Sequence, residues 1–313
     1  MTQPALRFRY HEPDIDTNRP IVEGQVKIEG FDLQVLPNDA EDYDVWEAGS
    51  TSLPPTIEAG KPELSIPVWP NRKFRLSYIF VNQAAGIEEP IDLEGKKVGL
   101  AAWTNPAGVW AKGALQNYYE VDLTKITWFA AGATQNKVPD GFRFQPIAKR
   151  ADLDPMLVSG ELDAVIEPNV LPSITKRDPR VRRLFRDYKS EEQKYWRETG
   201  IFPISHVVTL KRAFVQQHPD APIALLKAYR EAREIAFNRV QGSDPEYLIM
   251  TWASALIDEQ RALMGDNYWS YNVADNRPTL EALTRFCHQQ GLTDAQVNYE
   301  RFFDPDAAAF PGW

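Results

Sequence analysis

His206 is the leading candidate for a catalytic residue, because its imidazole stands in an otherwise apolar stretch. Imidazole titrates near neutral pH, so it can act as a general acid or base. A histidine in such a run is more commonly a hydrogen-bonded core residue, and both readings stay open here. His11, in a polar loop, and His218 and His288, near helix ends, carry less weight. None forms a His-x-x-x-His pair, so a histidine metal site has little support.

Arg72 and Arg75 form a candidate anion site. The planar guanidinium can bind a carboxylate through two parallel hydrogen bonds, so these residues are preferred to the intervening Lys73. Clusters of like charge are more often solvated surface, and the segment alone fixes no role. The chain has a net charge of −9, so a bound anion would need positive charge nearby.

Two further segments follow expected strands, where ligands of open α/β sheets bind. In the first, Glu47 is followed by Ser50 and Thr51, whose hydroxyls can donate to a ligand. In the second, Thr104 and Asn105 precede a helix, after a tryptophan, Trp103, that could stack on an aromatic ring. Free N–H groups at a helix N-terminus attract anions. Helix caps and turns use the same residue types, so structural and ligand-binding roles remain about equally supported.

Composition excludes several classes of protein. The 313 residues include no long basic block, so a nucleic-acid partner is not expected. Cys287 is the only cysteine, which rules out an internal disulfide, and it is expected in the core. Gly-x-Gly-x-x-Gly, Walker and Gly-x-Ser-x-Gly motifs are absent, which disfavours nucleotide and serine-hydrolase chemistry.

The elements that must position these residues alternate between strand and helix in the first two thirds of the chain. Such alternation predicts an α/β fold with helix-covered sheets. Expected strands cover residues 6–10, 31–36, 44–47, 65–68, 77–82, 97–102, 126–129, 164–166 and 204–210. Expected helices cover residues 106–119, 220–240, 245–256 and 279–290, and residues 139–151 are expected to form a loop.

The length favours two lobes. We expect lobe 1 to be discontinuous, with residues 1–83 and 206–313, and lobe 2 to contain residues 84–205. The first twenty residues have no apolar signal-peptide region, and no run is long enough to span a membrane, so a cytoplasmic location without membrane contact is expected. A monomer and a homo-oligomer both remain open.

Several segments together resemble the 4,5-dihydroxyphthalate decarboxylase family. The most specific are Pro-Val-Trp-Pro-Asn-Arg-Lys-Phe-Arg at 67–75 and Thr-Gly-Ile-Phe-Pro-Ile-Ser-His at 199–206. Others cover residues 19–24, 29–33, 81–82, 92–99, 183–185 and 276–280, of which 92–99 identifies only the fold. The resemblance implies a type II periplasmic-binding-protein-like fold: two mixed sheets flanked by helices, joined by two crossing strands, with a ligand cleft between the lobes.

The resemblance also implies a function, a cofactor-independent decarboxylase of a hydroxylated aromatic carboxylate, in phthalate degradation or other aromatic compound catabolism. His206, Arg72 and Glu47 would be catalytic. The substrate-binding residues would be Arg75, Ser50, Thr51, Trp103, Thr104, Asn105, Glu167 and Asn169. Asn169 stands where the family pattern predicts an arginine, and residues 46–60 also depart from it, which leaves the substrate open.

Two questions remain open on sequence alone. A divalent ion held by Glu47, Asp163 or Glu167 is an alternative to a cofactor-free site. The rival function is a non-catalytic solute-binding protein for an aromatic or other small organic anion, since most proteins of this architecture bind without reaction and fold does not fix function. A pyrimidine-synthesis enzyme that consumes its own histidine is disfavoured, because the chain has no cysteine-rich motif.

Overall fold

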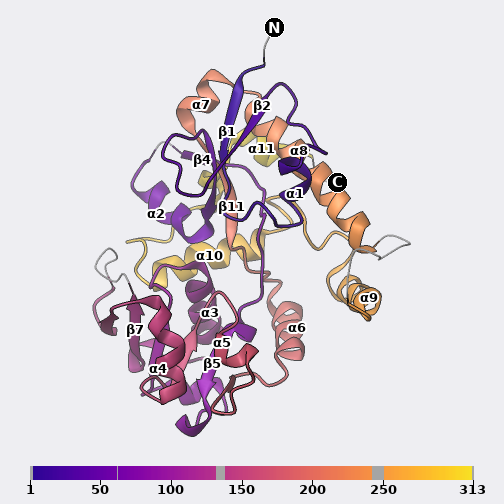
Figure 1. Cartoon of the computed structure of the whole chain (residues 1–313). Helices are drawn as coiled ribbons and strands as arrows, with labels where there is room; N and C mark the ends of the chain where they lie inside the picture. Colours follow the sequence, from indigo (N-terminus) through magenta and orange to yellow (C-terminus); the bar gives the residue numbers. More distant parts are fainter. Residues whose placement is uncertain (1–2, 62, 132–137, 242–249, 312–313) are drawn as a thin grey trace.

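The computed structural model describes residues 3–61, 63–131, 138–241 and 250–311, whose two sheets form two lobes (Figure 1). The first sheet has five strands within these residues, in the order β2-β1-β3-β11-β4. They are β1 (Ala5–Arg9), β2 (Asp32–Leu36), β3 (Val45–Gly49), β4 (Glu63–Ser65) and β11 (His206–Lys211). The strands β1, β2 and β3 are parallel, and β11 is antiparallel to β3 and β4. The carboxyl ends of β1 to β3 therefore share one edge with the first residue of β11, His206.

The second sheet has the order β10-β5-β9-β6-β7-β8 among the described residues. Its strands are β5 (Ile79–Asn82), β6 (Lys97–Leu100), β7 (Thr127–Ala131), β8 (Arg143–Ile147), β9 (Ala164–Ile166) and β10 (Val181–Arg183). The strands β6 to β9 run parallel, and β5 is antiparallel to β9 and β10. The predicted α/β architecture of two mixed sheets is confirmed.

Two segments cross between the lobes, residues 66–78 and 184–205, and they pair with each other. The Ser205 N–H donates to the Asn71 carbonyl at 2.8 Å, and the Lys73 N–H donates to the Pro203 carbonyl at 3.3 Å. The lobe boundary expected after residue 83 lies too late in the chain, because β5 already belongs to the second sheet.

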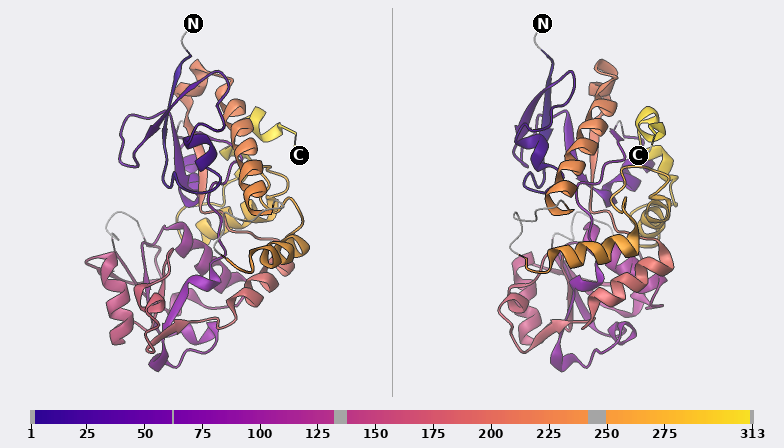
Figure 2. Two further views of the ribbon diagram at one scale, coloured as in Figure 1. Left: turned by 45° about the vertical axis from the view of Figure 1, so that its right-hand side comes forward. Right: turned by 90° about the vertical axis from the view of Figure 1, so that its right-hand side faces the viewer.

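Helices cover the sheets of both lobes (Figure 2). Their bounds are α1 (Arg19–Val22), α2 (Leu53–Glu58), α3 (Pro106–Asn117), α4 (Leu153–Ser159), α5 (Pro172–Thr175), α6 (Tyr188–Thr199), α7 (Arg212–Gln217), α8 (Ala221–Gln241), α9 (Ala253–Met264), α10 (Arg277–Gln289) and α11 (Pro305–Ala309). No helix in the described part of the chain has the length and apolar character needed to cross a membrane. The expected cytoplasmic location stays a prediction.

The contact between α3 and α10 shows how local sequence fixes the second lobe. Asn105 caps α3 by accepting from the Ala107 N–H at 3.0 Å, and Pro106 occupies the first turn. Gly113 lies where the ring of Phe286, from α10, fills the space that a Cβ would need, at 2.0 Å. A glycine is therefore required for this close packing, and α10 sits between the lobes (Figure 1).

Two strands, several helices and one helix position differ from expectation. The elements that lie outside the expected ranges are the strands β8 and β10 and the helices α1, α2, α4, α5, α6, α7 and α11. Both strands lie at the edges of their sheet, where Pro146 and two adjacent arginines are tolerated but obscure the strand pattern. The helix expected at residues 245–256 begins at Ala253 instead, and its positions 245–249 lie outside the described residues.

Candidate functional site

His206 and Glu47 form a hydrogen-bonded pair at the edge of the first sheet that faces the second lobe. The distance from His206 Nδ1 to Glu47 Oε1 is 2.7 Å. Val208 lies opposite Glu47 in the ladder, so His206, two residues earlier, projects from the same face of the sheet. The Glu47 side chain is fully buried and that of His206 is 14% exposed. The imidazole therefore has a buried partner on one nitrogen while part of its ring reaches the surface.

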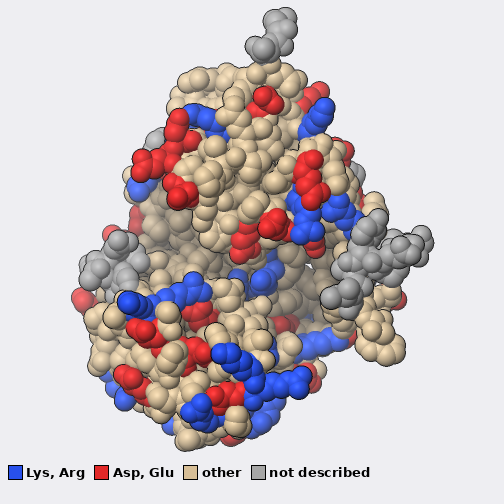
Figure 3. All heavy atoms as spheres, in the orientation of Figure 1, with Lys and Arg blue, Asp and Glu red and all other residues tan. Residues whose placement is uncertain are grey.

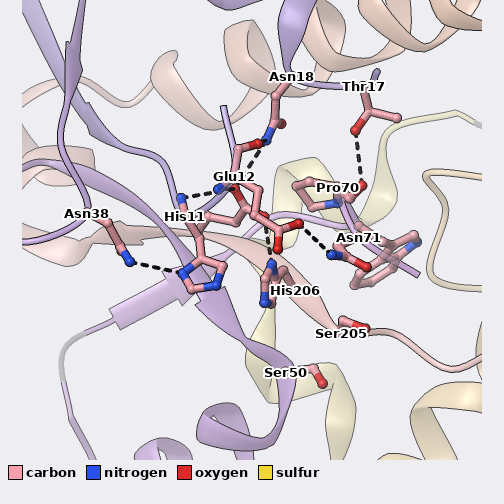
Figure 4. Close-up of polar contacts among 12 residues, drawn as sticks. His11, Glu12, Thr17, Asn18, Asn38, Ser50, Pro70, Asn71, Ser205 and His206 are labelled. Carbon is pink, nitrogen blue, oxygen red and sulfur yellow. Dashed lines mark hydrogen bonds and ion pairs between the residues drawn. The ribbon is translucent and has the colours of Figure 1, made fainter. Parts of the chain in front are cut away.

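Three further N–H groups hold the Glu47 carboxylate in place (Figure 4). Its Oε2 accepts from the His11 N–H at 3.2 Å, the Glu12 N–H at 3.5 Å and Asn18 Nδ2 at 3.1 Å. Residues 11 and 12 follow β1, the parallel neighbour of β3, so the sheet itself brings these donors to Glu47. Because both carboxylate oxygens have hydrogen-bond partners, the geometry supports a positioning role for Glu47 toward His206. Its expected catalytic role stays a prediction.

His11 is the site residue that the sequence did not single out. Its ring meets that of His206 edge to face, with centroids 4.6 Å apart and an interplanar angle of 86°. The Asn38 amide nitrogen lies 3.1 Å from His11 Nδ1 (Figure 4). His11 and Asn38 follow β1 and β2, two adjacent parallel strands, and that placement was the available signal.

Arg75 lies where the crossing segments meet the second lobe. Its Nη2 donates to the Ser205 hydroxyl, and its Nη1 donates to the Pro168 carbonyl at 3.3 Å. Burial lowers the pKa of Arg75 to about 10, while the nearby carboxylates of Glu192 and Glu12 oppose that effect. No carboxylate of the described residues lies within ion-pair distance of this guanidinium. Arg75 is therefore a buried cation that has no direct ion pair among the described residues.

Arg72 faces the opposite side of the crossing segment from the His206 cluster. Its neighbour Asn71 donates to Glu12 Oε2 at 2.9 Å, whereas Arg72 donates to the Phe202 carbonyl at 2.7 Å and stacks on the Phe202 ring. Burial lowers the pKa of Arg72 to about 9. Successive side chains of an extended segment point to opposite faces, which explains why Asn71 and Arg72 bind different groups. The expected catalytic role of Arg72 beside His206 therefore has no support in this geometry.

Hydroxyl residues of the first lobe bind protein groups. Ser50 Oγ donates to the Ile204 carbonyl at 2.6 Å, which ties β3 to the return crossing. Thr51 Oγ1 donates to the Thr104 carbonyl at 2.7 Å, a direct bond between the lobes. These bonds use the hydroxyl hydrogens of both residues, and their expected role in ligand binding stays a prediction.

The residues expected at the start of α3 are also engaged in structure. Trp103 is 1% exposed, donates from Nε1 to the Gln290 carbonyl at 3.0 Å and packs on the ring of Trp128. It therefore has no free face for a ligand, contrary to expectation. Thr104 and Asn105 remain half-buried at the helix N-terminus, with Asn105 serving as the cap.

The second lobe contributes a paired carboxylate. Glu167 is buried and forms an ion pair with Arg150, at 2.6 Å between Nη2 and Oε2, while Asn169 is exposed. Asp163, the other carboxylate considered for a metal, accepts from the Lys97 N–H at 2.8 Å. Among the described residues no group of three or more His, Cys, Asp or Glu side chains could hold a metal ion. Independence from cofactors remains a prediction.

The surface between the lobes is hollowed in Figure 3. Acidic side chains lie along its upper edge, and Lys and Arg side chains lie along its lower edge and at its base. A net-negative protein thus presents local positive charge where the lobes face each other, which favours an anionic ligand there.

Comparison with known proteins finds two similar decarboxylases. The chain is 28% identical over 309 residues to 4,5-dihydroxyphthalate decarboxylase of Comamonas testosteroni, covering 93% of this chain and 94% of that protein. It is 31% identical over 198 residues to 4,5-dihydroxyphthalate decarboxylase of Pseudomonas putida, covering 57% of this chain and 77% of that protein. No family model matches the chain.

Among solved structures, the periplasmic aliphatic sulphonate binding protein SsuA of Escherichia coli superimposes with a TM-score of 0.60 at 14% identity, covering 98% of this chain and 99% of that one. At this identity the likeness shows the fold alone. The chain therefore has the two-lobed type II architecture of periplasmic solute-binding proteins.

Proposed function

Because this chain belongs to the 4,5-dihydroxyphthalate decarboxylase family, we propose that it removes carbon dioxide from a hydroxylated aromatic carboxylate, such as 4,5-dihydroxyphthalate, bound between its lobes. Membership makes the chain an enzyme, a carboxy-lyase. The observation that carries the proposed site is the His206–Glu47 pair, in which a buried carboxylate holds an imidazole at the edge of the cleft.

The chemistry needs a proton at the carbon that carries the carboxylate. Direct loss of carbon dioxide would leave an unstable aryl anion, so protonation must come first. A hydroxyl para to the carboxylate supplies the electrons: once ionised, it pushes charge to that carbon, which takes a proton and becomes part of a dienone. The carbon–carbon bond to the carboxylate then breaks, carbon dioxide leaves, and its electron pair restores the aromatic ring. One proton is consumed and replaces the lost carboxylate.

His206 is the proposed proton donor. Glu47 accepts a hydrogen bond from Nδ1 and stabilises the imidazolium, so Nε2 can deliver its proton to the ring carbon and regain one from water. Arg75 is the proposed partner of a substrate carboxylate, because it is a buried cation with no acidic partner within ion-pair distance among the described residues. A phthalate carries two carboxylates, so one can stay on Arg75 while the other leaves.

The test is to incubate the purified protein with 4,5-dihydroxyphthalate and to follow substrate loss and carbon dioxide release. We expect turnover by the unaltered protein and none above background by His206→Ala. Undiminished turnover in His206→Ala would contradict the role of the histidine. Stoichiometric binding of the phthalate without any release of carbon dioxide would instead favour the solute-binding function.

A further inference from the structure

His11 and His206, at the edge of the first sheet, differ in what the Nδ1 atom of each ring faces. His206 Nδ1 faces Glu47 Oε1 at 2.7 Å, and a carboxylate can only accept. His206 therefore carries a proton on Nδ1. His11 Nδ1 faces the Asn38 amide nitrogen at 3.1 Å, and an amide NH₂ can only donate. His11 Nδ1 is therefore the acceptor, and the proton of the neutral ring lies on Nε2.

The two rings also lie close enough to address one substrate. Their centroids are 4.6 Å apart and their planes are nearly perpendicular. Figure 4 shows them side by side, with Asn38 on the side of His11 that faces away from His206. His11 is exposed and His206 partly so. A single benzene ring placed against both could thus meet His206 at one carbon and His11 at a substituent on its other side.

We propose that His11 is a second catalytic residue, which donates a hydrogen bond from Nε2–H to the oxygen of the substrate hydroxyl that lies para to the departing carboxylate. Asn38 is its positioning residue. This inference rests on the proposed function. It names His11 as the residue that recognises the para hydroxyl of the substrate.

The role follows from where charge develops. When the hydroxyl releases its proton to solvent, the oxygen becomes negative, and it becomes negative again as carbon dioxide departs and the ring regains aromaticity. A neutral N–H fixed at that oxygen stabilises both states, and it does so without giving up its own proton. The proton that reaches carbon comes from His206, so the overall balance remains one proton consumed for one carbon dioxide released.

Three titratable residues lie next to His11. His206 from β11 contacts its ring, Glu47 from β3 accepts from its backbone N–H, and Glu12 is its neighbour in the chain. The Asn38 amide donates to Nδ1, so in the neutral ring the proton lies on Nε2. An acidic residue at position 38 would reverse this preference, because its carboxylate would accept from Nδ1–H.

The experiment compares steady-state decarboxylation of 4,5-dihydroxyphthalate by His11→Ala, His11→Gln and Asn38→Asp across pH. We expect His11→Ala to lower kcat about 100-fold, the typical effect of losing a donor to a developing oxyanion. His11→Gln should recover part of that loss, since its amide also donates. Asn38→Asp should also lower kcat, because its carboxylate would hold the proton on Nδ1 and the neutral ring would then present an acceptor to the oxygen.

Two results overturn the inference, and they are distinguishable. If the unaltered protein turns over the substrate and all three variants stay within about twofold of it with the same pH profile, then His11 has no catalytic role although the proposed function stands. If the unaltered protein has no turnover, the proposed function fails and the role of His11 fails with it. Circular dichroism and thermal unfolding confirm that each variant is folded, which is expected because His11 and Asn38 are exposed.

Discussion

Replacement of Glu47 by glutamine should slow decarboxylation by weakening the protonated form of His206. Three N–H donors face Oε2, so the amide oxygen of Glu47→Gln should stay with them and its NH₂ group should face His206 Nδ1. The NH₂ group cannot accept from Nδ1–H. A hydrogen bond to a charged group is worth about 1.5–3 kcal/mol, and each 1.36 kcal/mol corresponds to a factor of ten, so loss of this bond should lower kcat about 10- to 100-fold.

The assay is kcat for carbon dioxide release between pH 5 and pH 9, about the range in which imidazole changes charge. The rate of Glu47→Gln should fall about 10- to 100-fold within this range, because the hydrogen bond that holds His206 is lost. Glu12→Gln is the matched control, since it removes a charge from the same edge of the sheet but leaves the 2.7 Å bond to His206 intact, and its effect should be under about tenfold. An unchanged kcat in Glu47→Gln, with urea unfolding showing a folded protein, would refute the orienting role of Glu47.

Three other variants or treatments test separate parts of the structure. Arg75→Met should raise KM about 10- to 100-fold with little effect on kcat, because a charge-assisted contact to the substrate is lost. Arg72→Met, on the opposite face of the crossing segment, should leave KM within about threefold. Equal effects of the two variants on steady-state kinetics would contradict the assignment of the two arginines to different faces. Burial lowers the pKa of Lys112 well below its ordinary value, so the unfolded state binds more protons and stability should rise with pH between the folded and unfolded pKa values. Lys112→Met should remove this contribution, as a flatter dependence of the urea midpoint on pH would show. Burial raises the pKa of the Cys287 thiol to about 12, so iodoacetamide at pH 8 should label the protein only in denaturant. Labelling is measured by mass spectrometry, and rapid labelling of the native protein would contradict the core position of Cys287.

The sequence predicted the central strands because their apolar runs are buried on both faces. The runs at 97–102 and 164–166 correspond to β6 and β9, the inner strands of the second sheet, and all of β9 is buried. The edge strand β8 was missed because exposure allows it polar residues and a proline. Hydrophobic periodicity therefore detects buried strands, and it misses strands that are mostly exposed.

The candidate site was predicted only in part, because spacing along a strand does not show which side a residue faces. His206 and Glu47 were both singled out, and their contact depends on the register of β11 against β3, which no local pattern reveals. Arg72 and Arg75 were treated as one cluster, yet they bind different groups. His11 was set aside as a loop histidine, although the topology brings its loop to the pair. Composition and motifs identify candidate residue types, and tertiary pairing decides which of them meet.

The position of β11 has a consequence for the order in which the protein is made. The strand lies between β3 and β4 in the first sheet, yet the chain reaches it only after all strands of the second sheet have been synthesised. We therefore expect a nascent chain on the ribosome to complete the second lobe while the first still has an open slot. His206 is the first residue of β11, so the His206–Glu47 pair forms in the same event that completes the first sheet. In a chain stalled on the ribosome before residue 206, this pair cannot form.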